Sequence, residues 1–444
     1  MTIYDYEARF GASDKTTKAM KDAIENWFDL YYMAQAQADR DPCQRVAYTV
    51  VNKLVKAMFG EYSAIAKDKA YQHLVDTLSG CKETAVQLAM VGGECYLKPC
   101  PAGENFSFTL IPRNNLLIFG RDGGGAPNDV GTMEVSTYGN AWYTLLERRS
   151  LDGEGLLTIE NRLFRSGDGS SLGTQVSLRE HPAYESLPES YRFESPLGGI
   201  GLVRMKTPML NCVDGTADGV SVYAAVAGLI RNIDRNEAQL TGEFDRGESR
   251  VILSRDMLRD GELQDHLFVG LDEDPERVGM TVYSPNLRYE AYLARKQEYL
   301  RSVESVIGMR RGMLSEVNME ERTAAEITSS AGDFNLTVIE LQKMWERAQE
   351  ETLTLCGHLA ELYQLPYPLE MGVSVDWGNS TLYDEDKIWE EYRQMVSMGL
   401  IAPEVALGWR FNLPCNTEAE RQIIRQRYMS PAKPSPGGEG GAAL

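Results

Sequence analysis

Residues 321–363 read ERTAAEITSSAGDFNLTVIELQKMWERAQEETLTLCGHLAELY, and this stretch carries the clearest structural signal of the chain. Small and apolar residues recur there in steps of three and four over more than five heptads, which is the spacing of one helical face. The stripe consists of Ala324, Ile327, Ala331, Phe334, Val338, Leu341, Trp345, Ala348, Thr352, Leu355, Leu359 and Leu362. The pattern predicts a helix over about 320–363, started by Asn318 with Glu321 and bent at Gly332.

Two further helices are expected before this stretch. Residues 218–245 keep one apolar face at helical spacing. A second helix is expected to begin at Ser284 and Pro285, because serine is a favoured N-cap and proline a favoured first helical residue. Gly308 is a typical residue for its C-terminal end.

Short segments connect these helices to one another. Three strand candidates, SRVILS, HLFVGL and VGMTVY, lie between the first and the second helix, with an acidic turn at 272–274. The segment MRRGMLSEVN, residues 309–318, then separates the second helix from the long one. This segment is short and carries two adjacent arginines and a glycine, so we expect a loop between the two helices.

The regions on either side differ in pattern. Residues 15–92 indicate three helices, of which the third covers about 68–92. In residues 94–205, by contrast, short apolar runs alternate with turn residues, which favours antiparallel strands. The segment GVSVDWG, 372–378, is a further strand candidate, and 384–428 has helical spacing. The Pro- and Gly-rich end MSPAKPSPGGEGGAAL has the composition of a disordered tail. The expected class is therefore α+β.

Composition narrows the functional classes. The chain has 444 residues and a formal charge of −20, from 65 acidic and 45 basic residues. A protein that grips DNA tightly neutralises phosphates with lysine and arginine, so the overall sign is wrong for that task. No apolar run approaches the ~20 residues of a membrane span, and no secretory signal is visible, so we expect folding in a cytoplasm. The seven cysteines include no Cys-x-x-Cys pair, which disfavours a disulfide framework or a structural zinc site.

Motifs for catalysis are missing from the sequence. It contains no phosphate-binding Gly-x-x-x-x-Gly-Lys-Ser/Thr loop and no His-Glu-x-x-His helix, and its four histidines lie far apart. Acidic clusters occur at 272–274 and 384–386, and a two-metal nuclease would need such carboxylates to converge in space. We therefore expect no enzyme, no catalytic residue, no metal and no cofactor.

The order of the elements resembles the portal proteins of tailed bacteriophages, particularly those of long-tailed phages. The similarity covers about residues 40–428 and is carried by an ordered set of segments rather than by one motif. Besides 321–363, the similar segments are QRVAYTVVNKLVKAMFGEY (44–62), AMVGGECYLKPC (89–100), FTLIPRNNLLIFG (108–120), DGVSVYAAVAGLIRNIDRNEAQLTGEFDRGESRVIL (218–253) and SPNLRYEAYLARKQEYLRSVESVIGM (284–309).

This resemblance implies a portal fold in a ring oligomer. Its parts would be a helical and sheet-rich wing, a two-helix stem, a small α/β clip, a long kinked helix and a helical crown. Carried onto this chain, the parts are the N-terminal helices and wing (1–217), first stem helix (218–247), clip (248–284), second stem helix (285–308), channel loop (309–319), long helix and returning strand (320–383), crown (384–430) and disordered tail (431–444).

The resemblance also implies a function. A dodecameric ring at one capsid vertex would form the channel for packaging and ejection of double-stranded DNA. The implied partners are the large subunit of the terminase motor, head-completion or tail adaptor proteins, and the major capsid and scaffolding proteins, with no membrane. The implied location is the head–tail junction of the virion, after assembly in the host cytoplasm.

Three groups of site residues follow from this assignment. The channel loop comprises Met309, Arg310, Arg311, Gly312, Met313, Leu314, Ser315, Glu316, Val317 and Asn318. The clip residues expected to dock partners are His266, Phe268, Asp272, Glu273 and Asp274, and those expected to pack core and subunit contacts are Phe334, Leu341 and Trp345. Two interpretations of Arg310 and Arg311 stay open: they contact DNA phosphates, or they pair with Glu316, Glu320 or a neighbouring subunit.

Two other functions remain as alternatives. The heptad stripe would suit a coiled-coil scaffold or adaptor protein, although the sheet-rich middle would not. The carboxylates would suit a metal-dependent nuclease or hydrolase only if folding brought them together.

Overall fold

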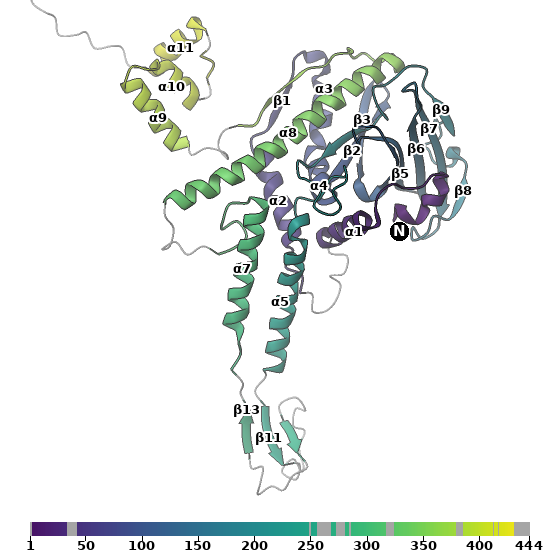
Figure 1. Cartoon of the computed structure of the whole chain (residues 1–444). Helices are drawn as coiled ribbons and strands as arrows, with labels where there is room; N and C mark the ends of the chain where they lie inside the picture. Colours follow the sequence, from purple (N-terminus) through teal and green to yellow (C-terminus); the bar gives the residue numbers. More distant parts are fainter. Residues whose placement is uncertain are drawn as a thin grey trace, which may run out of the picture. The chain divides into compact units, whose positions relative to one another are not determined.

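The computed structural model describes residues 2–32, 42–247, 250–254, 268–271, 280–283, 286–316, 324–378, 385–411, 413–415 and 417–429. The chain divides into two units, Met1–Asp376 and Trp377–Leu444. Both contain helices, and the first also contains several sheets, so the predicted mixture of α and β is confirmed (Figure 1). Within the described ranges, no helix combines the length and the apolar character that crossing a membrane requires.

Short helices make up the N-terminal part. They are η1 (Ile3–Phe10), α1 (Lys18–Tyr32), α2 (Val46–Phe59), η2 (Lys69–Tyr71), α3 (Gln72–Gly80) and α4 (Lys82–Gly92). The prediction for 15–92 is wrong in two places. Strand β1 (Ser63–Ala66) interrupts the helices, and the helix expected over 68–92 is divided at Cys81. The division occurs because the Cys81 N–H donates to the Leu78 carbonyl at 3.2 Å, a tight terminal turn that ends α3.

The strands predicted between 94 and 205 are present and pair antiparallel. They are β2 (Glu94–Ala102), β3 (Asn105–Pro112), β4 (Leu116–Arg121), β5 (Pro127–Tyr138), β6 (Ala141–Leu151), β7 (Leu157–Ser166), β8 (Thr174–Val176), β9 (Ser190–Arg192) and β10 (Val203–Lys206), with short 3-10 turns η3 (Arg113–Asn115) and η4 (Leu178–Glu180). One sheet has the order β10–β2–β3, and the larger one has the order β4–β5–β6–β7–β8 with β9 also on β7.

The N-terminal turn η1 covers one face of the larger sheet. Ile3 and Phe10 are buried in the same cluster as Phe119 and Leu146, which come from β4 and β6. Arg148 fixes this arrangement by donating to the Phe10 carbonyl at 3.2 Å. The first residues of the chain are therefore part of the core of the sheet.

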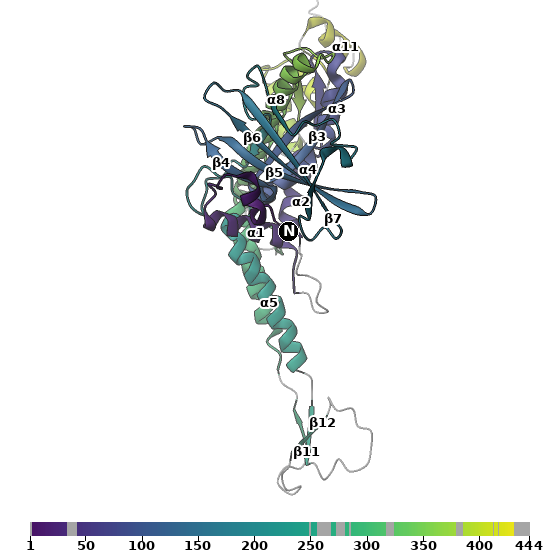
Figure 2. The same cartoon turned by 90° about the vertical axis from the view of Figure 1, so that its right-hand side faces the viewer.

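Helices α5 (Ala227–Arg246) and α7 (Tyr289–Ile307) flank a small sheet in the sequence. Strand β11 (Arg250–Ser254) lies in its centre, parallel to β12 (Phe268–Leu271) and antiparallel to β13 (Met280–Tyr283). All three strands were predicted. Only three residues separate α5 from β11, and five separate β13 from α7. This sheet must therefore lie next to the C-terminal end of α5 and the N-terminal end of α7 (Figures 1 and 2). As predicted, α7 ends at Gly308, which has a left-handed φ of 78°.

Both helices begin later than predicted. The first was expected from 218, but residues 218–223 are irregular and buried, and the 3-10 turn η5 (Ala224–Val226) precedes α5. The cause is a close backbone crossing, since a Cβ on Gly93 (φ +83°) would lie 2.4 Å from the Gly219 carbonyl carbon. A helical turn would not fit in this crossing. The second helix was expected from 285 and begins at Tyr289.

Helix α8 (Ala324–Tyr363) is one helix of 40 residues that continues through Gly332. It packs against α2, β2 and β10. Phe334 is buried, and Leu341 and Trp345 have no exposed surface. All three side chains thus pack in the core of this chain, as predicted for the stripe, and only Phe334 keeps some exposed surface, 7%. Their expected part in contacts between subunits stays a prediction.

The strand predicted over 372–378 is β14 (Val373–Asp376), which pairs antiparallel with β1. The second unit contains α9 (Glu385–Ser397), α10 (Pro403–Arg410) and α11 (Glu418–Tyr428), as expected for 384–428. Thr417 and Glu420 form a capping box at the start of α11. The tail predicted as disordered, 431–444, lies outside the described residues.

Candidate functional site

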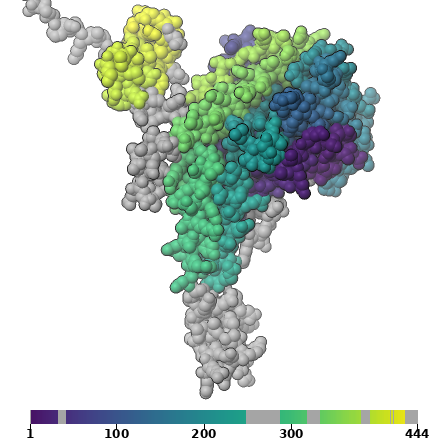
Figure 3. Space-filling view, viewed as in Figure 1, coloured from purple at the N-terminus to yellow at the C-terminus, as the bar shows by residue number. Residues whose placement is uncertain are grey.

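Helices α5 and α7 pack side by side as an antiparallel pair (Figures 1 and 3). Polar contacts run along the length of the pair. Arg288 binds both oxygens of Glu243 at 2.9 and 3.0 Å, and Lys296 lies 3.1 Å from Glu237. Residue numbers rise along α5 as they fall along α7 in these contacts, which defines the antiparallel direction. Between them, the buried Asn236 side chain donates to the Tyr292 carbonyl at 3.0 Å. The pair is thus joined by specific polar contacts as well as by apolar packing.

The described part of the predicted channel loop, 309–316, folds back on the end of α7. Met309 is buried, and its N–H donates to the Glu304 carbonyl at 2.8 Å. A turn follows, in which the Met313 N–H donates to the Arg310 carbonyl at 3.1 Å. Arg310 and Arg311 are exposed on this turn. The two adjacent arginines are therefore presented by an ordered backbone.

A buried carboxylate holds the backbone of this loop. Glu304 is 1% exposed and accepts hydrogen bonds from the Gly312 N–H at 3.1 Å and the Ser315 N–H at 2.9 Å. Lys53 of α2 donates to the Met313 carbonyl at 2.6 Å. These contacts fix the loop to two helices that are far apart in the sequence.

A buried charge network precedes α5. The Asp218 carboxylate accepts from Arg113 at 3.1 Å and from Arg121 at 2.7 Å. Burial alone would raise the pKa of Asp218, but the two guanidinium groups outweigh burial and lower this pKa. Glu94 binds Arg204 and is fully buried; its pKa is also lowered, because the arginine outweighs the cost of burial. The network connects the sheets to the segment from which α5 begins.

A second buried network lies within the sheets. Glu147 is paired with Arg149 at 2.6 Å and with Lys98 at 2.9 Å, and Lys98 also contacts Glu134 at 2.7 Å. Burial alone would raise the pKa of Glu147, but the two cations outweigh it and lower the pKa from 4.5 to about 2. The ionised form of this carboxylate is therefore strongly favoured in the folded state.

We predict that Glu147 makes the protein sensitive to acid. Because the folded-state pKa lies below the unfolded one, its stabilising contribution is complete above 4.5 and is lost as the pH falls towards about 2. Glu147→Gln should therefore be roughly 2–3 kcal/mol less stable than wild type near neutral pH. Urea unfolding at a series of pH values should show this difference shrinking in acid; a difference independent of pH would contradict the prediction.

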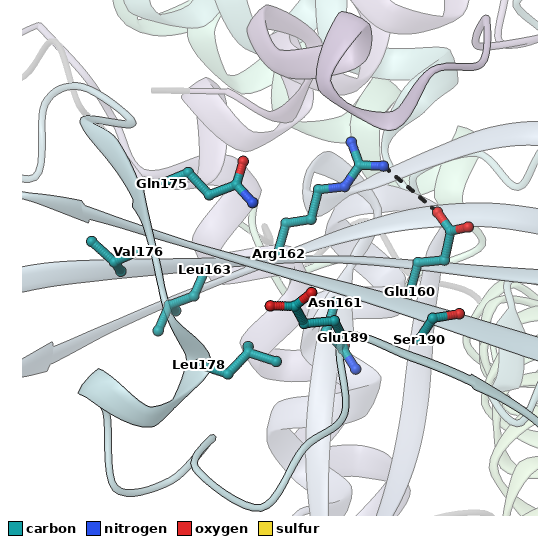
Figure 4. Close-up of a pocket in the computed structure, with 9 residues that line it drawn as sticks. All are labelled: Glu160, Asn161, Arg162, Leu163, Gln175, Val176, Leu178, Glu189 and Ser190. Atoms are coloured by element: carbon teal, nitrogen blue, oxygen red, sulfur yellow. Dashed lines mark ion pairs between the residues drawn. The ribbon is translucent and has the colours of Figure 1, made fainter.

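The structure also contains a polar cavity of about 250 Å³ beside β7, between the parts of its edge that pair with β8 and β9 (Figure 4). Glu160 and Arg162, which line it, are paired with each other at 3.7 Å. Among the described residues, no group of three or more His, Cys, Asp or Glu side chains is placed to hold a metal ion. We assign no function to this cavity: two of its three charged residues, Glu160 and Arg162, pair with each other, and no described contact in it points to a ligand.

The predicted site residues are only partly described. The backbone of Phe268 lies in β12. Val317 and Asn318 of the loop, and His266 with 272–274 of the clip, lie outside the described residues. Their assignments stay predictions.

The sequence interpretation missed Glu304 and Asp218. Glu304 gives a weak signal, because it lies among Leu300, Val303 and Ile307 on the buried face of α7, where a charged residue needs a partner. Asp218 gives no such local signal, because Arg113 and Arg121 are about a hundred residues away in the sequence.

Comparisons with known proteins add no assignment. A scan against protein-family models found no matching family. A search of curated proteins found no significant match to any of them.

Proposed function

We propose that this chain is a portal subunit of a tailed phage, and that copies of it close into a ring through which double-stranded DNA passes. The observation that carries the proposal is the order of the helices and strands between residues 227 and 363. A helix leads into a small sheet, an antiparallel helix returns, an arginine-bearing loop follows, and a 40-residue helix packs on the core. This arrangement corresponds to the stem, clip, channel loop and long helix of the resemblance.

The net charge of the chain suits a channel through which DNA slides better than a protein that binds DNA tightly. Duplex DNA carries one negative charge per ~1.7 Å of its axis, so a strongly basic channel would bind it all along its length. A chain of net charge −20 would repel most of the duplex. Arg310 and Arg311 would then make sparse, reversible phosphate contacts from the loop, and the energy for movement would come from a partner motor.

Observations on α8 weigh against the coiled-coil alternative. A coiled coil needs a free apolar seam, but Leu341 and Trp345 of the stripe are fully buried within the chain. The nuclease alternative has weaker support than the portal, because the described carboxylates form no metal-binding group. A nuclease assay with magnesium or manganese would test it directly.

The ring itself is tested by the mass and the image of the purified protein. Native mass spectrometry and negative-stain microscopy should show a large annular assembly with a central hole, with twelve subunits in the virion. A compact monomer at capsid-assembly concentrations would overturn the proposed function. Dimers to tetramers of elongated shape would favour the coiled-coil alternative instead.

We predict that Arg310→Ala/Arg311→Ala rings assemble normally but lower the amount of DNA packaged and retained at least about tenfold, because phosphate contacts are lost from every subunit. Arg179→Ala, which removes an exposed arginine from η4, is the matched control and should behave as wild type. DNA protected from nuclease in particles gives the readout. Normal packaging and retention by the double variant would show that the two arginines do not contact DNA.

A further inference from the structure

We infer that Glu304 is the positioning residue of the loop that carries Arg310 and Arg311. Its two carboxylate oxygens share the loop donors between them. One oxygen accepts from the Gly312 N–H at 3.1 Å, the Ser315 N–H at 2.9 Å and the Leu314 N–H. The other accepts from the Ser315 hydroxyl at 2.7 Å. The loop is therefore folded around one carboxylate.

The chemistry makes this anchor strong. An ionised carboxylate is costly to bury unless hydrogen bonds replace the water it has lost. Successive backbone N–H groups in a turn form a concave anion site, and bonds to a charged acceptor are shorter and stronger than neutral ones. Because Glu304 is 1% exposed in the closed state, the loop donors take the place of the water that this carboxylate has lost. The closed loop is the state in which this charge is satisfied.

Contacts from other elements hold the same loop. The Lys53 ammonium of α2 donates to the Met313 carbonyl at 2.6 Å, and the Glu316 N–H donates to the Gln297 side chain at 2.8 Å. Gly308, at the start of the loop, lies against Thr337 of α8, since a Cβ there would meet its hydroxyl at 2.5 Å. The arginine pair is thus tied to α2, α7 and α8, and a shift of any of these helices would move it.

Limited proteolysis measures how firmly Glu304 holds the loop closed, and this measurement needs no DNA. Trypsin cleaves after arginine only when the local backbone opens, so the cleavage rate follows the population of the open loop. We expect Glu304→Ala to be cut after Arg310 or Arg311 at least about tenfold faster than wild type, because several hydrogen bonds to a charged group are lost. Glu304→Gln keeps the volume and one acceptor oxygen but loses the charge, so its cleavage rate should lie between those of wild type and Glu304→Ala.

Two further variants keep the test decisive. Glu298→Ala removes a carboxylate whose side chain is 71% exposed on the same helix, and it should leave the cleavage rate unchanged. Ser315→Ala removes a single bond to Glu304 and should raise the rate severalfold even if Glu304→Ala fails to fold. Equal cleavage rates for wild type, Ser315→Ala and any folded Glu304→Ala would overturn the anchor.

The functional part of the inference rests on the proposed portal function and has its own readout. If Glu304 acts by positioning the arginines, Glu304→Ala should lower DNA retention as far as Arg310→Ala/Arg311→Ala does, and the triple variant should be no worse. Additive losses would contradict a positioning role. If wild type forms no ring, the proposed function fails, whereas the proteolysis result still decides whether Glu304 anchors the loop.

Discussion

Trp345→Ala is expected to lower the free energy of unfolding by about 3–5 kcal/mol, the usual cost of deleting a large buried aromatic side chain. The Trp345 ring is fully buried and lies edge-on to Phe59, with the ring centres 6.0 Å apart. Its indole N–H donates to the Tyr62 hydroxyl at 3.1 Å, and this hydroxyl donates to Gln349 at 3.1 Å. The substitution would leave both a cavity and a broken hydrogen-bond chain between α8 and the end of α2.

Urea unfolding of the purified variant measures this effect. Leu336→Ala on the same helix is the matched control, because its side chain is 63% exposed and its removal should change stability by no more than about 0.5 kcal/mol. If the proposed ring forms, Trp345→Ala should impair its assembly only as far as it destabilises the subunit. Rings lost at full subunit stability would instead show that Trp345 makes a subunit contact, against its position in the structure.

The long helix could be predicted from sequence because its signal is local. A 3.6-residue period over residues 324–363 needs no knowledge of the rest of the fold. What covers the stripe was not predictable in the same way. Tyr62, which contacts Trp345, is 283 residues away in the sequence. The pattern therefore identified a buried face of the helix. It did not show whether this face is covered by residues of the same chain or by a second copy of the chain.

The start of α5 was predicted too early because long-range contacts, rather than local spacing, decide the structure there. Val222 and Val226 are four residues apart, which is the spacing of one helical face, and both are buried. However, the Val222 N–H donates to the Met90 carbonyl at 2.9 Å, so long-range backbone pairing replaces helical pairing there. Tertiary contacts overrode local propensity at a place where two distant segments cross.

The candidate loop was located by its neighbours rather than by its own residues. Gly308 marked its start, and the structure confirms that α7 ends there. The exposure of the two adjacent arginines is a finding of the structure. Its anchor was not predicted, because a glutamate within a helix usually lies on the solvated face. Only the apolar residues around Glu304 indicate that this one is buried.

Asp218→Asn is expected to destabilise the protein by about 3–5 kcal/mol, because it removes one partner from a buried ionic network. Asp218 is 1% exposed and is shared between Arg113, which is fully buried, and Arg121. Asparagine has almost the same size, so no cavity forms. The amide leaves Arg113 without a negative partner at this position, and the segment that leads into α5 loses its ionic attachment to Arg113 and Arg121.

The pH dependence separates this electrostatic effect from a packing defect. The pKa of Asp218 is lowered in the folded state, so its stabilising contribution is present near neutral pH and is lost as the pH falls through that lowered value. The gap in unfolding free energy between wild type and Asp218→Asn should therefore narrow in acid. Asp22→Asn on the exposed face of α1 should stay within about 0.5 kcal/mol of wild type at every pH. A gap of constant size would mean that the charge of Asp218 does not stabilise the fold, and that the segment before α5 is held without this ionic contact.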